Sequence, residues 1–364
     1  MAIAHSLKDI SRQAGVSLAT VDRVLHDRKG VRDSMRRRVL QAMDELSRQT
    51  LELSLHGSRL TIDLVMEAPD RFSSAVRLAL EAQLAAHLPV LMRVRSHLGE
   101  TATGEEIAAI MARIRKRGSN GILLKAPDHP SIRAEILACA KARIPVVTLV
   151  TDLPHSARQA YVGMDNHAAG GMAAWLASGW MPPETHAGRS ILVVVSSNRF
   201  VGEEERARGF REWLQQYAPH LAIVSLGEGR GLDWQTYDLV ANTLRDRPDI
   251  AGIYSIGGGN HAIARALRDC LIEPRLFIAH DLDRDNRALL SDGTITAILH
   301  HDLTADMLLA CRIFTSANQL RPPIQNICPS PAQLITRFNL PPMGQQLTDS
   351  LSNISTHRHA RPGE

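Results

Sequence analysis

A short stretch near the start of the chain, residues 18–25, carries side chains whose types and spacing suit contact with the edges of DNA bases. Val21, Val24 and Leu25 recur at helical spacing and predict the buried face of a helix. The remaining residues lie opposite or beside that face: Leu18, Ala19, Thr20, Asp22 and Arg23. An arginine can bond both acceptors of a guanine edge, and an apolar side chain can touch a thymine methyl group. These residue types predict that the exposed face of this helix contacts the edges of base pairs.

Two capped helices joined by a glycine turn would hold this face outward. Ser6 can cap the first helix, with Asp9 three residues later as in a capping box. Gly15 permits the positive φ of a sharp turn, and Ser17 can cap the second helix. The spacing predicts a helix-turn-helix whose second helix enters the major groove. An ordinary helical hairpin inside an enzyme is the alternative, but the caps and the turn argue against it.

Charge is concentrated in this first part of the chain. Residues 1–59 contain eleven Lys or Arg against seven Asp or Glu, an excess equal to the +4 of the whole chain. The basic run Arg36, Arg37 and Arg38 follows the predicted reading helix and suits contact with phosphates. A basic head suits a polyanion, and a neutral remainder suits an uncharged ligand or another subunit.

Length and cysteine usage restrict the remaining possibilities. The 364 residues suffice for a small head and a large body. The four cysteines, Cys139, Cys270, Cys311 and Cys328, lack C-x-x-C spacing and predict reduced packing residues, not metal ligands. No apolar run suits a signal peptide or a membrane span. We therefore expect a cytoplasmic, nucleoid-associated protein with no metal or other cofactor and no membrane partner.

From Leu60 onward, short apolar strands alternate with helical stretches. The predicted strands are 60–66, 90–94, 121–124, 146–150, 160–162, 190–196, 222–226, 252–255, 276–280 and 297–299. The predicted helices between them are 72–87, 105–117, 131–142, 168–178, 204–216, 234–245, 260–270 and 284–290. Such units form parallel, doubly wound sheets covered by helices. Over about 240 residues they predict an α/β body of two lobes with ligands at the carboxyl ends of the strands.

The order of these segments resembles one known family. Leu7-Lys8-Asp9-Ile10, Ala14-Gly15-Val16-Ser17 and Arg23-Val24-Leu25 resemble the DNA-binding head of the LacI-type (LacI/GalR) repressors. The body is similar to the effector domain of that family, which is itself similar to periplasmic sugar-binding proteins. The resemblance covers about residues 6–340. It implies a homodimer that binds a pseudo-palindromic double-stranded DNA operator and responds to a small molecule, most simply a sugar or polyol, in the cleft between the lobes.

The resemblance and the change of pattern at Leu60 predict a domain order. The expected segments are a helix-turn-helix domain at 1–50, a hinge or linker at 51–59, an effector domain at 60–340 and a polar tail at 341–364. Within the effector domain, we expect one lobe of about 60–161 with 302–330, and a second of 162–301 with 331–340.

The resemblance also assigns roles in the head. Base reading falls to Leu18, Ala19 and Arg23, and phosphate positioning to Leu7, Ser17, Thr20 and Arg36. Asp22 stands where the family usually has Ser, and it can accept from a cytosine amino group or orient Arg23.

The effector residues implied by the resemblance are polar groups near strand ends. They are Asp165, Asn166, Arg206, Asn260, Asp281 and His301, the last at a position where the family commonly has Gln. Asp, Asn and Arg are planar bidentate partners that suit pairs of sugar hydroxyls. An aromatic ring, Phe72 or Trp234, would cover the apolar face of a sugar. The structural alternative for Asp165 or Asp281 is a helix cap.

Other classes stay open beside the predicted repressor. The effector can be a corepressor or a non-sugar metabolite, because linkage allows either sign of coupling. The body can be an α/β enzyme fused to a DNA-binding head, although no G-x-S-x-G, P-loop or zinc motif is found. A periplasmic binding protein would instead carry a secretion signal and no head. We therefore predict a sequence-specific transcriptional regulator without enzymatic activity, controlled allosterically by its effector.

Overall fold

The computed structural model describes residues 6–28, 30–55, 57–84, 87 and 90–341. The chain divides into two compact units, residues 1–60 with 87–91 and residues 61–86 with 92–364. The first unit is called the head below and the second the body. Apart from Pro341, the predicted polar tail lies outside the described residues.

The described part of the head contains three helices, α1 (Leu7–Ala14), α2 (Leu18–Leu25) and α3 (Asp33–Leu55). The hydroxyl oxygen of Ser6 caps α1 by accepting from the Asp9 N–H at 3.2 Å. Ser17 caps α2 in the same way through the Thr20 N–H at 3.3 Å. Between them Gly15 has a φ of 62°, the left-handed conformation that the turn requires. These local signals were all readable in the sequence.

A small apolar core holds the three helices together. Its buried members are Ile10, Ala14, Val21, Val24, Val39 and Ala42. The third helix is longer than the sequence pattern indicated: α3 continues to Leu55 and so enters the segment 51–59, where we expected a linker.

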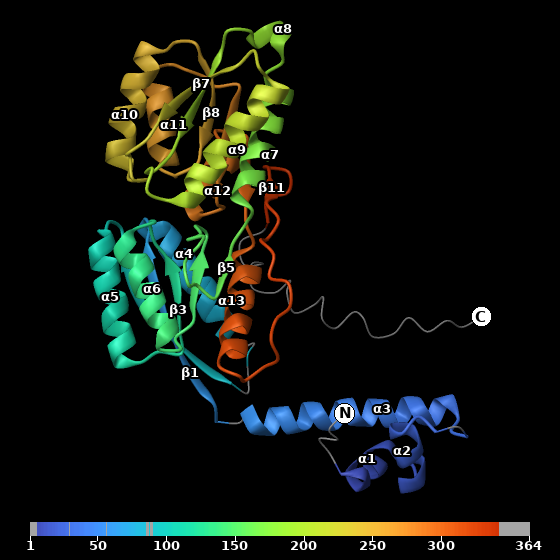
Figure 1. Cartoon of the computed structure of the whole chain (residues 1–364). Coiled ribbons are helices and arrows are strands. Elements are labelled where there is room, and N and C mark those ends of the chain that lie inside the picture. The colour runs from blue at the N-terminus through green and yellow to red at the C-terminus, as the bar shows by residue number, and fades with distance from the viewer. Residues whose placement is uncertain (1–5, 29, 56, 85–86, 88–89, 342–364) are drawn as a thin grey trace, which may run out of the picture. The chain divides into compact units, whose positions relative to one another are not determined.

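The body contains two β-sheets (Figure 1). The first has the strand order β2-β1-β3-β4-β5, formed by β1 (Arg59–Glu67), β2 (Leu91–Gly99), β3 (Gly121–Lys125), β4 (Val146–Leu149) and β5 (Ala160–Val162). The second has the order β11-β10-β9-β8-β6-β7, formed by β6 (Ser190–Val194), β7 (Ala222–Leu226), β8 (Ile250–Ser255), β9 (Leu276–His280), β10 (Ala297–His300) and β11 (Gln333–Ile335). Strands β6 to β10 pair in parallel, and β11 pairs antiparallel with β10.

Helices cover both faces of each sheet. One core of the first sheet involves α4 (Asp70–Leu84) and α13 (Leu303–Ala317), and the other involves α5 (Gly104–Arg117) and α6 (Pro130–Lys141). On the second sheet, α7 (Asn166–Trp180) and α9 (Val201–Tyr217) share one core, and α10 (Asp233–Asp246), α11 (Asn260–Asp269) and α12 (Arg284–Ser291) share the other. The predicted fold class, two doubly wound lobes after a helical head, is confirmed.

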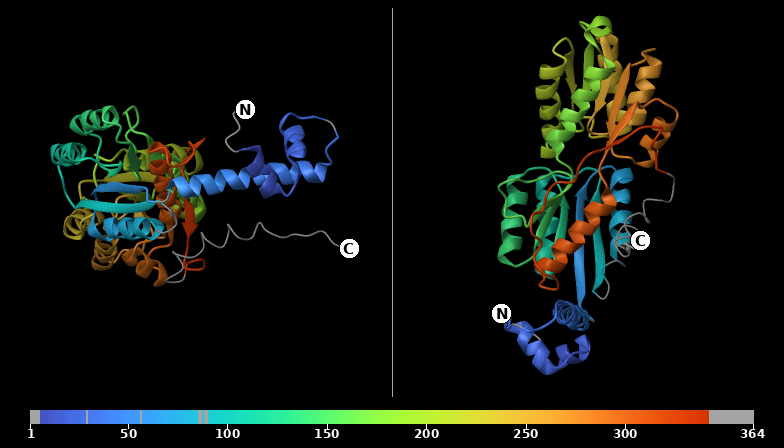
Figure 2. Two further views of the ribbon diagram at one scale, coloured as in Figure 1. Left: turned by 90° about the horizontal axis from the view of Figure 1, so that it is seen from below. Right: turned by 90° about the vertical axis from the view of Figure 1, so that its right-hand side faces the viewer.

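The chain crosses between the two sheets more than once. After β10 in the second sheet, α13 returns to cover the first sheet (Figure 2). Met307 and Phe314 of α13 are buried there in one core with residues of α4. The following segment then adds β11 to the second sheet. Neither α13 nor β11 was predicted, and neither was the short helix α8 (Pro183–His186). Helix α13 was missed because its apolar residues are too numerous to form a clear stripe at helical spacing. Strand β11 was missed because it is too short to show alternation of apolar and polar residues.

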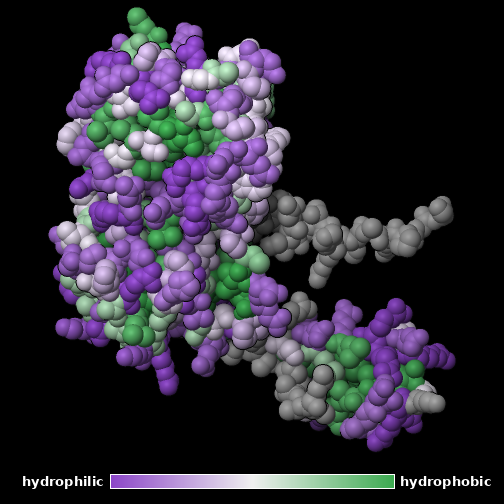
Figure 3. All heavy atoms as spheres, turned by 45° about the horizontal axis from the view of Figure 1, so that its top comes forward, coloured by the Kyte–Doolittle hydropathy of each residue, from purple (hydrophilic) through white to green (hydrophobic). Residues whose placement is uncertain are grey.

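The surface and the cysteines agree with a packed α/β body. Hydrophilic side chains predominate on the face drawn in Figure 3, and apolar side chains show in separate groups. Cys139 and Cys311 are buried as expected, whereas Cys328 is exposed, so its predicted packing role is wrong. In the described part of the chain, no helix is both long and apolar enough to cross a membrane.

Close contact between α7 and α9 sets the position of the Arg206 side chain. A Cβ atom at Gly170 of α7 would overlap the carbonyl oxygen of Arg206 in α9, and one at Gly209 would overlap that of His167. The two helices therefore touch backbone to backbone. This contact fixes the segment of α9 that carries Arg206.

We predict that Gly170→Ala lowers the free energy of unfolding by about 3 kcal/mol, because overpacking must push the two backbones apart. Urea denaturation followed by circular dichroism measures this change. Gly179→Ala is the matched control in the same helix, since a Cβ there meets nothing within 4 Å. The control should change stability by at most about 1 kcal/mol, toward greater stability. Equal effects of the two substitutions would contradict the close-contact explanation.

Candidate functional site

The residues of α2 that the sequence predicted to contact bases lie on its solvent-exposed face. Leu18 is 51% exposed, and Ala19 and Arg23 are exposed as well. Val21 and Val24 on the opposite side are buried in the head core. Among the described residues, Arg23 has no partner for an ion pair or a side-chain hydrogen bond. Its guanidinium group is therefore available to a ligand.

Asp22 has partners of its own within the head. Its carboxylate lies 3.0 Å from Nδ1 of His26 and 3.1 Å from Nη1 of Arg28. Of the two roles expected for Asp22, orientation of Arg23 is not observed, because these two neighbours take the carboxylate instead. Acceptance from a cytosine amino group stays a prediction.

The residues expected to contact phosphates lie around the start of α2 and on α3. Ser17 and Thr20 lie beside each other, with their hydroxyl oxygens 2.9 Å apart, and Leu7 is partly exposed. Arg36 on α3 donates to the Asp27 carboxylate at 2.6 Å. This pair is exposed and therefore weak, so a phosphate can replace Asp27 as the partner of Arg36.

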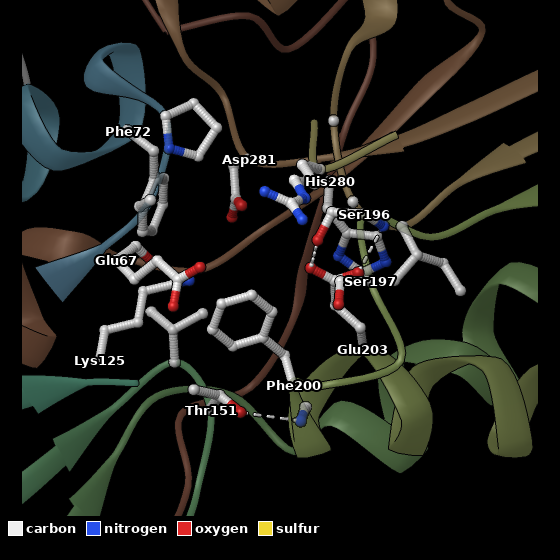
Figure 4. A pocket seen from close by; sticks show the side chains of 18 of the residues that line it. Glu67, Phe72, Lys125, Thr151, Ser196, Ser197, Phe200, Glu203, His280 and Asp281 are labelled. Carbon is white, nitrogen blue, oxygen red and sulfur yellow. Dashed lines mark hydrogen bonds between the residues drawn. The ribbon is translucent and has the colours of Figure 1, made fainter. Parts of the chain in front are cut away.

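The body contains a pocket at the carboxyl ends of strands from both sheets (Figure 4). Its empty space, the open mouth included, is about 890 Å³. The first sheet and its helices contribute Glu67, Phe72 and Lys125 to the wall, and the second contributes Phe200 and Asp281. The location is the one that parallel α/β sheets generally use for ligands.

Arg206 lies at the inner wall of the pocket and is only 3% exposed. Its Nε donates to Oδ1 of Asn166 at 2.7 Å, and Nδ2 of Asn166 donates to the carbonyl oxygen of Val150 at 3.0 Å. Among the described residues, nothing accepts a hydrogen bond from Nη2 of Arg206, although this atom is buried. A buried donor without a partner is costly, so this nitrogen is a candidate ligand contact.

Asp281 is held by a buried histidine. His301 Nε2 lies 3.3 Å from Oδ1 of Asp281, and His301 Nδ1 lies 2.7 Å from Oδ2 of Asp306 on α13. Burial lowers the pKa of His301, but its two aspartate partners outweigh that effect and raise the pKa to about 9. Burial raises the pKa of Asp281, yet His301 and Arg206 hold it well below its usual value. The pocket therefore presents a carboxylate at neutral pH.

Two ion pairs in the pocket join charged groups of the protein to each other. Arg199 binds the Glu67 carboxylate at 3.0 Å, and Arg71 lies 3.2 Å from Asp283. The described lining contains equal numbers of acidic and basic side chains: Glu67, Glu100, Glu203, Asp281 and Asp283 against Arg71, Lys125, Arg199, Arg206 and Arg230. The lining is thus formally neutral, which suits an uncharged ligand.

Of the predicted effector residues, Phe72, Arg206 and Asp281 line the pocket. Asn166 and His301 lie behind them, as the partners of Arg206 and Asp281. The structure does not bring the others to the pocket. Asp165 is exposed and caps α7, where it accepts from the Ala168 N–H at 2.9 Å, and Asn260 donates to Asn286 at 2.7 Å. The alternative of a helix cap therefore describes Asp165 better than direct ligand contact.

The pocket also contains residues that the sequence did not reveal. Trp234, considered as an aromatic platform, is 69% exposed and is not part of the lining, whereas Phe200 lies in the pocket with Nζ of Lys125 4.1 Å from the ring centre. Glu67 and Lys125 are the last residues of β1 and β3, so the expectation that ligands bind at the carboxyl ends of strands could have identified them. His280 is likewise the last residue of its strand, β9, and was not predicted to contact the ligand.

Fold and pocket together define a two-lobed ligand-binding body that follows a helix-turn-helix head, and comparisons with known proteins agree. Residues 69–305 match the model of the periplasmic binding protein domain, and residues 6–48 match the model of bacterial regulatory proteins of the lacI family. The chain belongs to the periplasmic binding protein domain family, and its head carries the DNA-binding domain of the bacterial regulatory proteins of the lacI family.

Individual relatives match the head and the body to different extents. The sucrose operon repressor of Escherichia coli is 55% identical over 42 residues, 12% of this chain and 13% of the repressor, so the match spans only a small part of that relative's length. An uncharacterized HTH-type regulator of Streptomyces limosus is 30% identical over 216 residues, 58% of each chain.

Solved structures resemble the body. The glucose-galactose binding protein GanP of Geobacillus stearothermophilus has a TM-score of 0.68 at 22% identity, covering 78% of this chain and 99% of that one. A solute binding protein of Burkholderia graminis in complex with D-arabinose has a TM-score of 0.69 at 20% identity, covering 78% and 97%. A putative LacI regulator of Bacteroides fragilis has a TM-score of 0.66 at 14% identity, covering 78% and 98%. At these identities the likeness establishes the fold.

The buried His301 makes stability depend on pH. Its pKa in the folded protein, about 9, exceeds the ordinary value of 6.5, so its contribution is complete below pH 6.5 and is lost as the pH rises through 9. We predict a fall in the free energy of unfolding of at most about 1.4 kcal/mol per pH unit in this range. Urea denaturation at several pH values measures it. In His301→Gln this component should disappear, and identical pH profiles of the two proteins would contradict the assignment.

Proposed function

We propose that this protein is a homodimeric, sequence-specific DNA-binding regulator, a repressor in the simplest case, controlled by a neutral sugar or polyol bound in the body. The observation that carries the proposal is a neutral pocket that ends in an unpartnered Arg206 nitrogen and the Asp281 carboxylate, on the same chain as an open recognition helix. It would act in the cytoplasm, where its operator DNA lies at the nucleoid, and the role is binding, not catalysis.

The head supports the DNA half of the proposal. Leu18, Ala19 and Arg23 are exposed on α2, and the second helix of a helix-turn-helix reads the major groove. Leu7, Ser17, Thr20 and Arg36 would position the phosphates. The name of the sucrose operon repressor, which matches this chain in the head, points the same way. A dimer would place two such heads on a pseudo-palindromic operator.

The pocket supports the effector half. Arg206 offers donors and Asp281 offers acceptors, the pair that adjacent sugar hydroxyls require, and Phe72 can cover an apolar sugar face. A phosphorylated sugar would add negative charge to a lining whose charges already cancel, so we favour an unphosphorylated ligand. Structurally similar proteins are described as binding glucose and galactose or D-arabinose. We further propose the domain limits given above, 1–50, 51–59 and 60–340.

We predict that Arg23→Ala weakens binding to the operator about tenfold to a hundredfold, because a bidentate contact to guanine is lost. The operator can be selected from random duplex DNA with the wild-type protein, and fluorescence anisotropy then gives the affinities. Arg77→Ala, which removes the same charge from α4 of the body, is the control and should bind normally. The logarithm of the wild-type affinity should fall linearly with the logarithm of salt concentration. Unchanged binding of Arg23→Ala would contradict the proposed reading face.

We predict that Asp281→Asn reduces the affinity for the sugar effector about tenfold or more, while operator affinity without sugar stays near normal. Calorimetry with D-glucose, D-galactose, D-arabinose, D-allose and D-fructose measures binding, and anisotropy of the operator measures the response and its sign. Asp165→Asn is the matched control, since Asn caps a helix as well as Asp does. If no sugar binds the wild-type protein, or if both variants respond equally, the effector proposal is wrong.

A further inference from the structure

A buried pair of side chains behind the pocket has a hydrogen-bonding arrangement that the proposed function does not explain. Tyr254 on β8 is fully buried, and its hydroxyl oxygen lies 2.8 Å from Nε2 of His280, the last residue of β9. His280 is only 4% exposed, yet it belongs to the pocket lining beside Asp281 (Figure 4). Among the described residues, nothing bonds to its other ring nitrogen, Nδ1, although that atom is buried.

The protons of this pair can be assigned by elimination. Burial and the nearby Arg206 keep the pKa of His280 well below its usual value, so the ring carries one proton at neutral pH. Burial raises the pKa of Tyr254, so the phenol stays protonated. Nε2 of His280 is the one acceptor within reach of that phenol among the described residues. Tyr254 therefore donates to Nε2, and the ring proton resides on Nδ1.

The result is a second buried donor without a partner in the same pocket. Nη2 of Arg206 is the first, and both nitrogens belong to side chains that are more than nine-tenths buried. Oδ1 of Asp281 is buried in the same wall and lies 3.3 Å from Nε2 of His301, its ion-pair partner. Two donors that the described residues leave without an acceptor, beside a carboxylate, point to a ligand that supplies the missing bonds.

We propose that His280 recognises the effector through Nδ1–H, that Tyr254 positions it by fixing this tautomer, and that His280 and Arg206 together bind an acceptor oxygen of the ligand. This inference rests on the proposed function, since it adds a specificity residue to the same pocket. The ligand oxygen is a ring, carbonyl or hydroxyl oxygen, the last donating its own proton to Asp281. An ammonium group at this position is rejected, because two donors would face it.

The tautomer can be tested without any ligand. Nitrogen chemical shifts of histidine in the full-length, ¹⁵N-histidine-labelled protein at pH 7 distinguish protonated from unprotonated ring nitrogens, and the signals of His280 are those missing from His280→Gln. We expect the proton on Nδ1 in the wild-type protein and a mixture of tautomers in Tyr254→Phe. A proton on Nε2 in the wild-type protein would overturn the inference.

Two substitutions at one position separate ligand contact from packing. The amide of Asn reaches the place of Nδ1, whereas the amide of Gln reaches the place of Nε2. For the tightest-binding sugar of the panel, we expect His280→Gln to lose affinity about tenfold and the double variant Tyr254→Phe/His280→Asn to stay within about threefold of the wild type. Tyr254→Phe is included because His280→Asn alone would leave the buried hydroxyl of Tyr254 without an acceptor.

The outcomes distinguish this inference from the proposal on which it rests. If the wild-type protein binds a sugar but His280→Gln binds it equally well, or the double variant binds it no better than His280→Gln, the role of His280 is wrong and the sugar site stands. If the wild-type protein binds none of the sugars, the effector proposal is wrong, and the role of His280 is wrong with it. Melting temperatures of all variants show that each protein is folded at the assay temperature.

Discussion

The ligand site depends on one buried ion pair network, in which His301 lies between Asp281 and Asp306. Asp281 has a φ of 65°, a conformation that side-chain-bearing residues adopt at a cost, and the buried imidazolium keeps its carboxylate ionised. Asp306 belongs to α13, which packs on the first sheet, whereas Asp281 follows β9 of the second. The network therefore joins the pocket to the segment that crosses between the sheets. Removing His301 would leave two buried carboxylates without their cation.

The second constraint is the backbone contact between α7 and α9. The glycines at this contact let α9 approach closely enough for Nε of Arg206 to reach Asn166, the first residue of α7. Asn166 in turn bonds to the carbonyl oxygen of Val150, whose φ of 64° is unusual for a β-branched residue. Arg206 is thus fixed from behind, and its free nitrogen is the part left for a ligand. This arrangement explains why Asn166 matters without touching the pocket.

Sequence reasoning succeeded where the signal was local and failed where it depended on packing between distant segments. The caps Ser6 and Ser17 and the turn at Gly15 act over three or four residues, so the head could be read directly. Strand ends located the pocket edge, but they could not say which side chains point into it. Asp165 and Asp281 both follow strands, and only the structure separates the helix cap from the pocket carboxylate. The tautomer of His280 depends on Tyr254, 26 residues away on another strand, and no sequence pattern encodes that pairing.

The charge pairs of the pocket also limit how an effector can act. Arg199 with Glu67 and Arg71 with Asp283 already link the walls from the two sheets through groups of the protein itself. A ligand changes the balance between two conformations only through its differential affinity for them. Contacts that merely replace these ion pairs would contribute little, because one hydrogen-bonded partner substitutes for another. We therefore expect the differential affinity to come from the two donors that the described residues leave without an acceptor, at Arg206 and His280, and from the Asp281 carboxylate beside them. The three residues that we propose to bind the ligand are thus the ones through which it would control the protein.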